Sequence, residues 1–246
     1  DHRPQAMADA ARRAEASGAF LIDINMGCPV RKIARKGGGS GLIRDPELAT
    51  RIVEAVAGAV AVPVTVKTRL GWDDNSKYIV EVAERLQDVG IKAISIHGRT
   101  RAQMYKGEAD WSLIAAVKEN PRMTIPVFGN GDIDSPEKAL RYKNTYGVDG
   151  IMVGRAAIGA PWFFQQVKRF FATGDAGAPP DMAERIRAVR THLRHSIEWK
   201  GERLGIVEMR RHYANYFRGL PHFKEYRLAL VTLDDPAALE AKLTEI

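Results

Sequence analysis

The 246-residue sequence contains a single cysteine, so no disulfide can form within the chain. It has no apolar run near the roughly 18 residues that a membrane-spanning helix needs, and no secretory signal pattern opens it. His97 stands too far along the chain from other histidines and from Cys28 for metal-ligand spacing. We therefore expect a cytoplasmic protein without a metal site and without a membrane partner.

The sequence does have an excess of positive charge. Its net charge is +7 and its pI is about 9.5, which favours a polyanionic partner. Residues 182–227 carry 11 Lys and Arg against 5 Asp and Glu, with His, Tyr and Phe between them. Basic residues interleaved with aromatic rings are typical of an RNA-binding surface. The alternative is a solvated helical face whose aromatic residues lie in the core.

Five short runs rich in Val and Ile alternate with helix-like segments over the first two thirds of the chain. Strands that are apolar on both faces and alternate with helices form a parallel sheet covered by helices, so the pattern predicts an α/β fold. The predicted strands are 20–25, 62–68, 93–98, 125–131 and 149–154, and clear helical patterns span 45–60 and 76–90.

Two architectures fit five such strands, an open doubly wound sheet or the last five βα units of a TIM (β/α)8 barrel. Glycine-rich turns follow the last two strands, and the loops after strands seven and eight of a barrel commonly bind phosphate. We therefore favour the barrel, with its first three strands outside this sequence. The predicted domains are a partial TIM barrel at 1–171, a linker at 172–181 and an all-helical domain at 182–246.

The single cysteine, Cys28, lies just past the first predicted strand. A buried cysteine is often only a small hydrophobe. A thiol with the ordinary pKa of about 8.5 is also protonated at neutral pH, so it can donate a proton. Asn25, three residues earlier, offers a donor and an acceptor to an amide or imide edge. The glycine-rich stretch 37–41 does not complete a dinucleotide-binding fingerprint, and we expect it to be a mobile loop.

Basic side chains end the next two predicted strands. Lys67 and Arg69 are two residues apart, as are His97 and Arg99, so each pair points to one side. A lysine is costly to bury without an anion, which predicts an anionic cofactor or substrate. The glycine-rich turns 129–133 and 154–159 offer backbone amides to a phosphate.

Several segments together resemble the tRNA-dihydrouridine synthases, in order over essentially the whole chain. They are DINMGCPVRKI, VKTRLGW, ISIHGRTRAQMYKG, GNGDI and GIMVGRAAIGAPWFF. The segment EMRRHYANYFRGLPHFKEYR resembles that family's helical RNA-binding domain. The sequence departs from the family at its start, because three barrel strands and a flavin-contacting glutamine are absent. Its glycine-rich stretch also has glycines where the family more often has alanines.

The resemblance implies an FMN enzyme that uses NADPH to reduce a uridine in tRNA to 5,6-dihydrouridine. Hydride would reach C6 of the uracil, and Cys28 would give a proton to C5. A monomer is expected, with an exposed basic run, 31–36, facing RNA. The substrate would be held by Asn25, Arg69 and Arg99. The residues implied to bind FMN are Lys67, His97, Asn130, Gly131, Asp132, Gly154 and Arg155.

Two other functions remain open on the residues alone. One is a flavin barrel that reduces free pyrimidines, as in dihydropyrimidine dehydrogenases, where a similar Asn–Cys turn occurs. The basic helical domain and the lack of iron–sulfur cysteines argue against it. The other is a non-catalytic RNA-binding or regulatory protein that keeps the fold, against which flavin binding would count.

Overall fold

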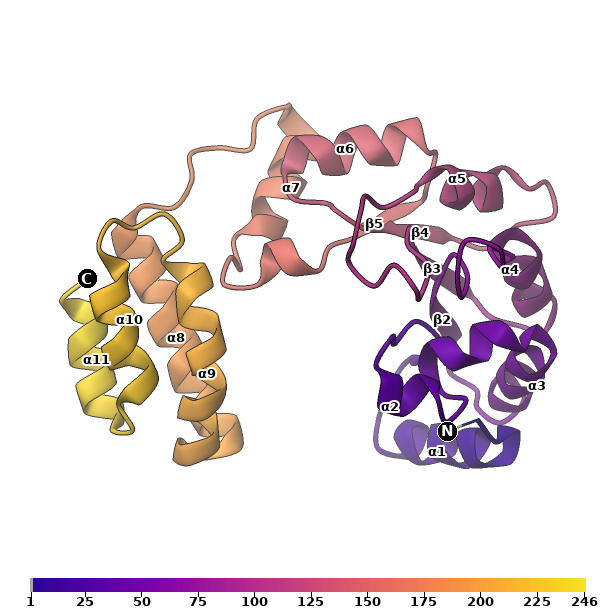
Figure 1. The fold of residues 1–246 in the computed structure, drawn as a ribbon, viewed down its shortest axis with the longest axis horizontal. Coiled ribbons are helices and arrows are strands. Elements are labelled where there is room, and N and C mark those ends of the chain that lie inside the picture. Colours follow the sequence, from indigo (N-terminus) through magenta and orange to yellow (C-terminus); the bar gives the residue numbers. More distant parts are fainter. Residues whose placement is uncertain (1) are drawn as a thin grey trace. The chain divides into compact units, whose positions relative to one another are not determined.

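The computed structural model describes residues 2–246 (Figure 1). The chain forms two compact units, which are treated separately below. The first comprises the residues up to 134 together with 138–153, and the second comprises 135–137 together with 154–246. Residues 154–171 thus group by contacts with the helical part of the chain. The functional domain limits predicted from the sequence, around the linker 172–181, stay a prediction.

The first unit is built on a five-stranded parallel sheet whose strand order follows the chain. A doubly wound sheet reverses its order at a switch point, whereas neighbouring barrel strands are consecutive. The observed order therefore agrees with the predicted barrel segment and not with the doubly wound alternative. The strands are β1 (Ile22–Asn25), β2 (Val64–Arg69), β3 (Ala93–His97), β4 (Val127–Asn130) and β5 (Gly150–Met152).

The two faces of this sheet differ in chemistry. Alternate residues such as Ile24, Val66 and Ile94 are at most 3% exposed and form one apolar face. The intervening residues are largely polar. Lys67 pairs in register with Asn25, and His97 pairs with both Arg69 and Asn130, so these five side chains come from one face at the carboxyl end of the strands.

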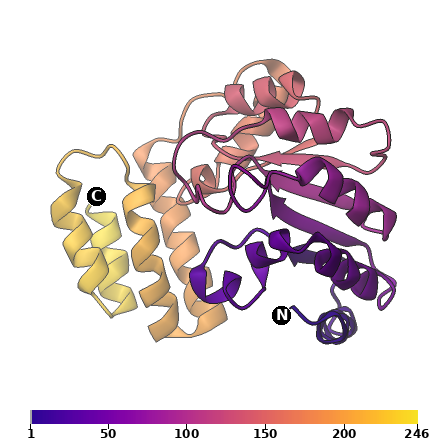
Figure 2. The same ribbon diagram turned by 45° about the vertical axis from the view of Figure 1, so that its right-hand side comes forward.

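Helices connect the strands of the first unit (Figure 2). The start of α3 follows the local chemistry, because the Asp45 carboxylate accepts from the Leu48 N–H at 2.9 Å and Pro46 occupies the first turn. Gly90, at φ +106°, follows the end of α4. The helices are α1 (Pro4–Ala16), α2 (Arg31–Ala34), α3 (Pro46–Ala57), α4 (Ile79–Asp88), α5 (Ser112–Glu119) and α6 (Pro136–Thr145), which crosses the unit limit.

The glycine-rich stretch, expected to be a mobile loop, is mostly helical, and its mobility stays a prediction. Most of it lies in the 3-10 helix η1 (Gly39–Arg44), in which Ser40 is fully buried and its N–H donates to the Cys28 carbonyl at 3.1 Å. A Cβ at Gly39 would lie 2.9 Å from the Cβ of Cys28, and one at Gly41 would lie 2.5 Å from the Ala34 carbonyl oxygen. The expectation of a loop was wrong because glycine here permits close packing of two backbones.

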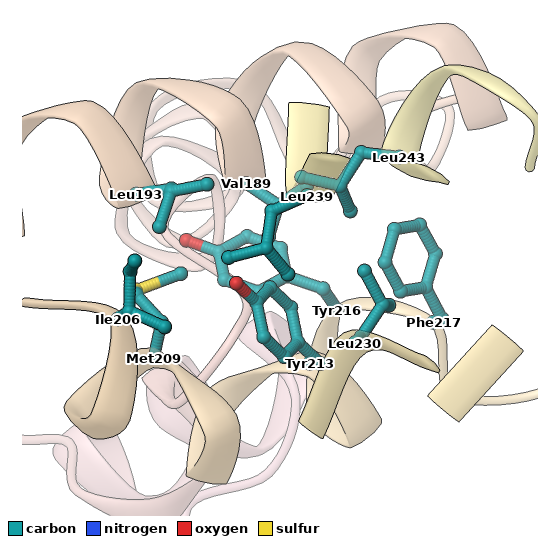
Figure 3. Packing of buried hydrophobic residues seen from close by; sticks show 10 residues of the cluster. All are labelled: Val189, Leu193, Ile206, Met209, Tyr213, Tyr216, Phe217, Leu230, Leu239 and Leu243. Atoms are coloured by element: carbon teal, nitrogen blue, oxygen red, sulfur yellow. The ribbon is translucent and has the colours of Figure 1, made fainter. Parts of the chain in front are cut away.

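The second unit is all-helical over residues 154–246, a range that includes the all-helical segment predicted at 182–246. A capping box of Asp181 and Glu184 begins α8, which packs along α9 (Figure 1). The elements are η2 (Arg155–Ala157), α7 (Phe163–Thr173), α8 (Met182–Lys200), α9 (Glu202–Tyr216), α10 (Phe223–Thr232) and α11 (Pro236–Thr244). Figure 3 shows the core among α8, α9, α10 and α11, formed by Val189, Leu193, Ile206, Met209, Tyr213, Tyr216, Phe217, Leu230, Leu239 and Leu243.

Within residues 2–246, none of the helices is both long and apolar enough to cross a membrane. The same residues contain no group of three or more His, Cys, Asp or Glu side chains placed to hold a metal ion.

Candidate active site at the strand ends

Cys28 lies on a turn that is fixed from several directions. The Oδ1 of Asn25 accepts from the backbone N–H groups of Gly27 at 3.0 Å and of Cys28 at 3.1 Å. The Nε of Arg69 donates to the Gly27 carbonyl at 2.8 Å. Together with the bond from Ser40 described above, these contacts fix the backbone of a half-buried cysteine. The contacts therefore hold the Cα of Cys28 in place beside the end of β1.

The turn also defines what Asn25 can offer a ligand. Its Oδ1 is occupied by two backbone donors, whereas its Nδ2 has no hydrogen-bond partner within residues 2–246. From the sequence, both a donor and an acceptor were expected of this side chain. The structure leaves the donor, which suits a carbonyl oxygen of a ligand.

Lys67 is the next residue on this face, paired in register with Asn25. Its ammonium group makes no hydrogen bond or ion pair with the residues that the structure describes. Burial, followed by the positive charge of Arg69, lowers the pKa of Lys67 to about 8, and only Asp23 opposes the shift. An anion beside the Lys67 nitrogen would offset both the cost of burying its charge and the repulsion from Arg69.

His97 is buried near the same positive charges. Its pKa is lowered to about 3 by burial first and then by Arg69, Lys67 and Arg99, against the weaker opposing effect of Asp132. The imidazole is therefore neutral at physiological pH, and it can exchange hydrogen bonds without adding charge.

Arg69, predicted to contact substrate, mainly joins two loops. It is 4% exposed, and besides the Gly27 carbonyl it donates through Nη1 to the carbonyls of Thr100 and Met104, both at 3.1 Å. These bonds connect the Cys28 turn to the loop after β3. The geometry therefore favours a positioning role for Arg69, and its substrate contact stays a prediction.

Arg99 makes a comparable connection further along the same loop. It is 2% exposed and forms a two-point ion pair with Asp132, with nitrogen–oxygen distances of 2.8 and 2.7 Å. The same side chain donates to the carbonyls of Lys106 and Gly107, and Asp132 accepts from the Ala109 N–H at 2.8 Å. A carboxylate repels phosphate, so a phosphate contact of Asp132 would have to use its backbone N–H.

Close packing shapes the turn after β4. Gly131 has φ +130°, and a Cβ there would lie 2.6 Å from that of Ala109 and 3.1 Å from His97. Its carbonyl accepts from the indole of Trp111 at 3.1 Å, while Asn130 donates to the Met152 carbonyl at 2.8 Å. Because Gly131 has no side chain, a ligand can approach the backbone of this turn closely. Gly154 and Arg155 belong to the second unit, and their place beside this turn stays a prediction.

Trp72, which lies in the segment VKTRLGW, had no role predicted from the sequence. The guanidinium groups of Arg44 and Arg101 lie over its ring, 5.0 and 4.7 Å from the centroid. Arg44 ends η1, Trp72 follows β2 and Arg101 follows β3. The stack therefore joins the helix that packs on Cys28 to the loops after the next two strands. Its only signal in the sequence is one tryptophan among several arginines.

Comparison with known proteins gives a consistent result. The family model described as dihydrouridine synthase (Dus) matches residues 1–246. The probable tRNA-dihydrouridine synthase 1 of Synechocystis sp. is 49% identical over 221 residues, which are 90% of this chain and 61% of that protein. The tRNA-dihydrouridine synthase B of Pseudomonas putida is 43% identical over 234 residues, which are 95% of this chain and 69% of that protein.

Among solved structures, histamine dehydrogenase from Rhizobium sp. 4-9 aligns with a TM-score of 0.51 at 19% identity. The match covers 66% of this chain and 27% of that chain, and it bears on the fold alone. The chain spans 61% of the length of the Synechocystis relative and 69% of that of the Pseudomonas relative.

Proposed function

The chain belongs to the dihydrouridine synthase family, and from that premise we propose that it reduces a uridine in tRNA to 5,6-dihydrouridine with FMN as cofactor and NADPH as reductant. One observation carries the proposal. The only thiol of the chain lies on a turn fixed by Asn25 and Arg69, next to a strand end where the Lys67 ammonium makes no ion pair with the described residues.

The residues of the first unit fit FMN in two respects. The unpartnered ammonium group of Lys67, beside the further positive charge of Arg69, suits an anionic group. The turn at Gly131 has no side chain and can approach a phosphate with its backbone. Lys67, His97, Asn130, Gly131 and the backbone of Asp132 would hold the cofactor, and Gly154 and Arg155 would complete its phosphate site.

Three side chains of the first unit would each have a separate role in the reaction. When bound, reduced FMN supplies the hydride that adds to C6 of the uracil. The thiol of Cys28 gives its proton to C5, so that one hydride and one proton saturate the C5–C6 bond. The Nδ2 of Asn25 donates to a uracil carbonyl and orients the ring. Cationic Lys67 offsets negative charge on the reduced cofactor.

The tRNA would be held mainly by positive charge. A base inside a helix cannot reach a strand-end site, so the uridine must be extruded, which costs a few kcal/mol. On and beside α2, Arg31, Lys32, Arg35 and Lys36 are all exposed, close in sequence to Cys28. These residues and the basic helices of the second unit would supply phosphate contacts. A monomeric, cytoplasmic protein is part of the same proposal.

The test uses the full chain with FMN and NADPH on an unmodified tRNA transcript. We expect a nucleoside heavier by about 2 Da, the mass of the two added hydrogens, detected by mass spectrometry after digestion. Cys28→Ala should lower the rate by at least about 100-fold, because general acid catalysis is worth that much or more. Its flavin absorbance should stay that of the parent.

Two results would contradict the proposal. Unchanged dihydrouridine formation in Cys28→Ala would remove the thiol from the reaction. Faster reduction of free uracil than of the transcript, measured in parallel, would indicate the pyrimidine-reductase alternative. Cys28→Ser serves as the size-matched variant, since its hydroxyl fills the same space but is a much weaker acid.

A further inference from the structure

A cavity lies wholly within the second unit, and Gly154, proposed above to complete the FMN phosphate site, is at its edge among the lining residues. It has a volume of about 820 Å³ and is lined by the segment 154–161 on one side and by α8 and α9 on the other. Ligand pockets commonly fall in the range of about 300–1,000 Å³. Ile158 and Pro161 contribute apolar surface, and His192, His195 and His212 contribute rings.

The two walls of this cavity are joined by a close backbone contact. Gly159, at φ +67°, lies so near α9 that an added Cβ would be 2.6 Å from the Cβ of Asn215 and 2.8 Å from the Tyr216 nitrogen. The Trp162 ring also meets Tyr216 edge-on, with centroids 6.1 Å apart. The cavity is therefore a feature of the packed unit.

Aromatic rings form the inner part of the cavity. The ring centroids of His192 and His212 lie 4.8 Å apart, and Nδ1 of His192 shares a hydrogen bond of 3.1 Å with the hydroxyl of Tyr216. Burial is the main cause that lowers the pKa of both histidines, with help from nearby positive charges. Both imidazoles are thus neutral near pH 7 and present uncharged ring faces, which suit stacking with a heteroaromatic base.

Positive charge lies at the mouth. Arg187 and His195 are exposed, and Arg187 has no hydrogen bond or ion pair within residues 2–246. No Asp or Glu is among the described residues that line the cavity. The neighbouring Glu208 is already paired with Lys200 and Arg211. An unpaired guanidinium beside a ring-lined cavity is the arrangement that a phosphate attached to a base would use.

We propose that this cavity binds a nucleotide, with its base packed against the rings of His192, His212 and Tyr216 and its phosphate on Arg187. Two sources share this chemistry, an RNA nucleotide other than the reduced uridine and a soluble dinucleotide such as NADPH. The RNA source rests on the proposed function, whereas the cavity itself does not. The two sources are separated by experiment.

The experiment measures the dissociation constants of the full chain for an unmodified tRNA transcript and, separately, for NADPH. Arg187→Gln should weaken one of them about tenfold, the loss expected for one charge-assisted hydrogen bond. Arg194→Gln is the matched control, because it removes the same charge from an exposed site on α8 outside the cavity. It should change neither constant by more than about twofold.

A second pair of variants tests the cavity without changing charge. Ala188→Phe fills it and should weaken the same ligand about tenfold, since the base loses its place. Ala183→Phe puts the same ring on an exposed position of α8 outside the cavity and should have no effect. Thermal unfolding of each variant shows whether it folds like the parent.

The outcomes are distinct. Weakened tRNA binding assigns the site to RNA, and weakened NADPH binding assigns it to the dinucleotide. Equal effects of Arg187→Gln and Arg194→Gln would overturn the proposal, because diffuse charge then explains binding. Folded Arg187→Gln and Ala188→Phe with parental constants for both ligands would also overturn it. If the parent binds tRNA through Arg187 yet forms no dihydrouridine, the proposed activity fails while the nucleotide site stands.

Discussion

The buried arginines of the first unit and two buried polar groups of the second unit differ in their partners. In the first unit, the buried arginines Arg69 and Arg99 are fully engaged with carbonyls and with Asp132, and each joins two segments of the site. In the second unit, the hydroxyl of Tyr213 and Nδ1 of His212 are buried without partners. Unpartnered buried atoms occur in the first unit as well, at the Ser40 hydroxyl and at Nε of Arg101, so the contrast lies in the two arginines that join the loops of the site.

The largest expected effect comes from breaking the buried ion pair between Arg99 and Asp132 in the first unit. Asp132→Asn leaves the buried guanidinium of Arg99 without its counter-charge, and we expect a loss of about 3–5 kcal/mol in the free energy of unfolding. Asparagine tolerates the left-handed φ of +55° at this position, so backbone strain is not the cause. Denaturant unfolding of the full chain measures the loss.

The exposed pair of Arg12 and Asp9 provides the control for this prediction. Both side chains are about half exposed, at 52% and 51%, and water screens their interaction. Asp9→Asn should leave the unfolding transition unchanged. If Asp132→Asn also left the unfolding transition unchanged, the ion pair with Arg99 would not hold the site together.

The next effect concerns the unpartnered lysine of the first unit. Lys67, with its pKa lowered to about 8, is cationic below that pH and loses its charge as pH rises through it. Affinity for anionic FMN should therefore be highest below pH 8 and fall above it, by at most about tenfold per pH unit for one proton. Quenching of flavin fluorescence between pH 7 and 10 measures this dependence.

Lys67→Gln should bind FMN more weakly and without that pH dependence, because the titrating group is gone. The neutral imidazole of His97, with its pKa near 3, should add no step in this range. A parental affinity that stays constant from pH 7.5 to 9.5 would show that Lys67 does not contact the anion.

The smallest expected effect concerns the buried tyrosine hydroxyls of the second unit. Tyr213→Phe removes a buried hydroxyl that has no partner, so the free energy of unfolding should stay the same or rise by about 1 kcal/mol. Tyr216→Phe on the same helix removes a hydroxyl bonded to His192 and should lower it. The reverse order of the two variants would mean that the buried polar groups of this unit are not as the structure places them.

Much of the fold followed from the sequence because its signals are local. The five strands begin and end within a few residues of the predicted runs, and Asp45 and Gly90 bound their helices as expected. Alternation along the strands also predicted that Lys67 and Arg69 share a side, and register places them with Asn25 and His97. These inferences need only periodicity and the common edge of parallel strands.

The parts that escaped prediction depend on contacts between distant segments. The stretch around Gly39 has no periodicity, and its 3-10 helix exists because it packs on Cys28. The side of the strand on which Arg69 lies was predictable, but its bonds to the carbonyls of Thr100 and Met104 were not, since a loop about 30 residues further on supplies them. The roles of the site residues in binding and catalysis remain predictions.

The ring of Trp72 has a consequence for how this region can vary. Arg44 and Arg101 reach it from two other segments. Each of the three connecting segments must therefore have the length that brings its residue to this stack. An insertion in any of them would displace a partner from the indole and, through η1, disturb the backbone beside Cys28. Engineering of this face should therefore exchange the three connections as a set.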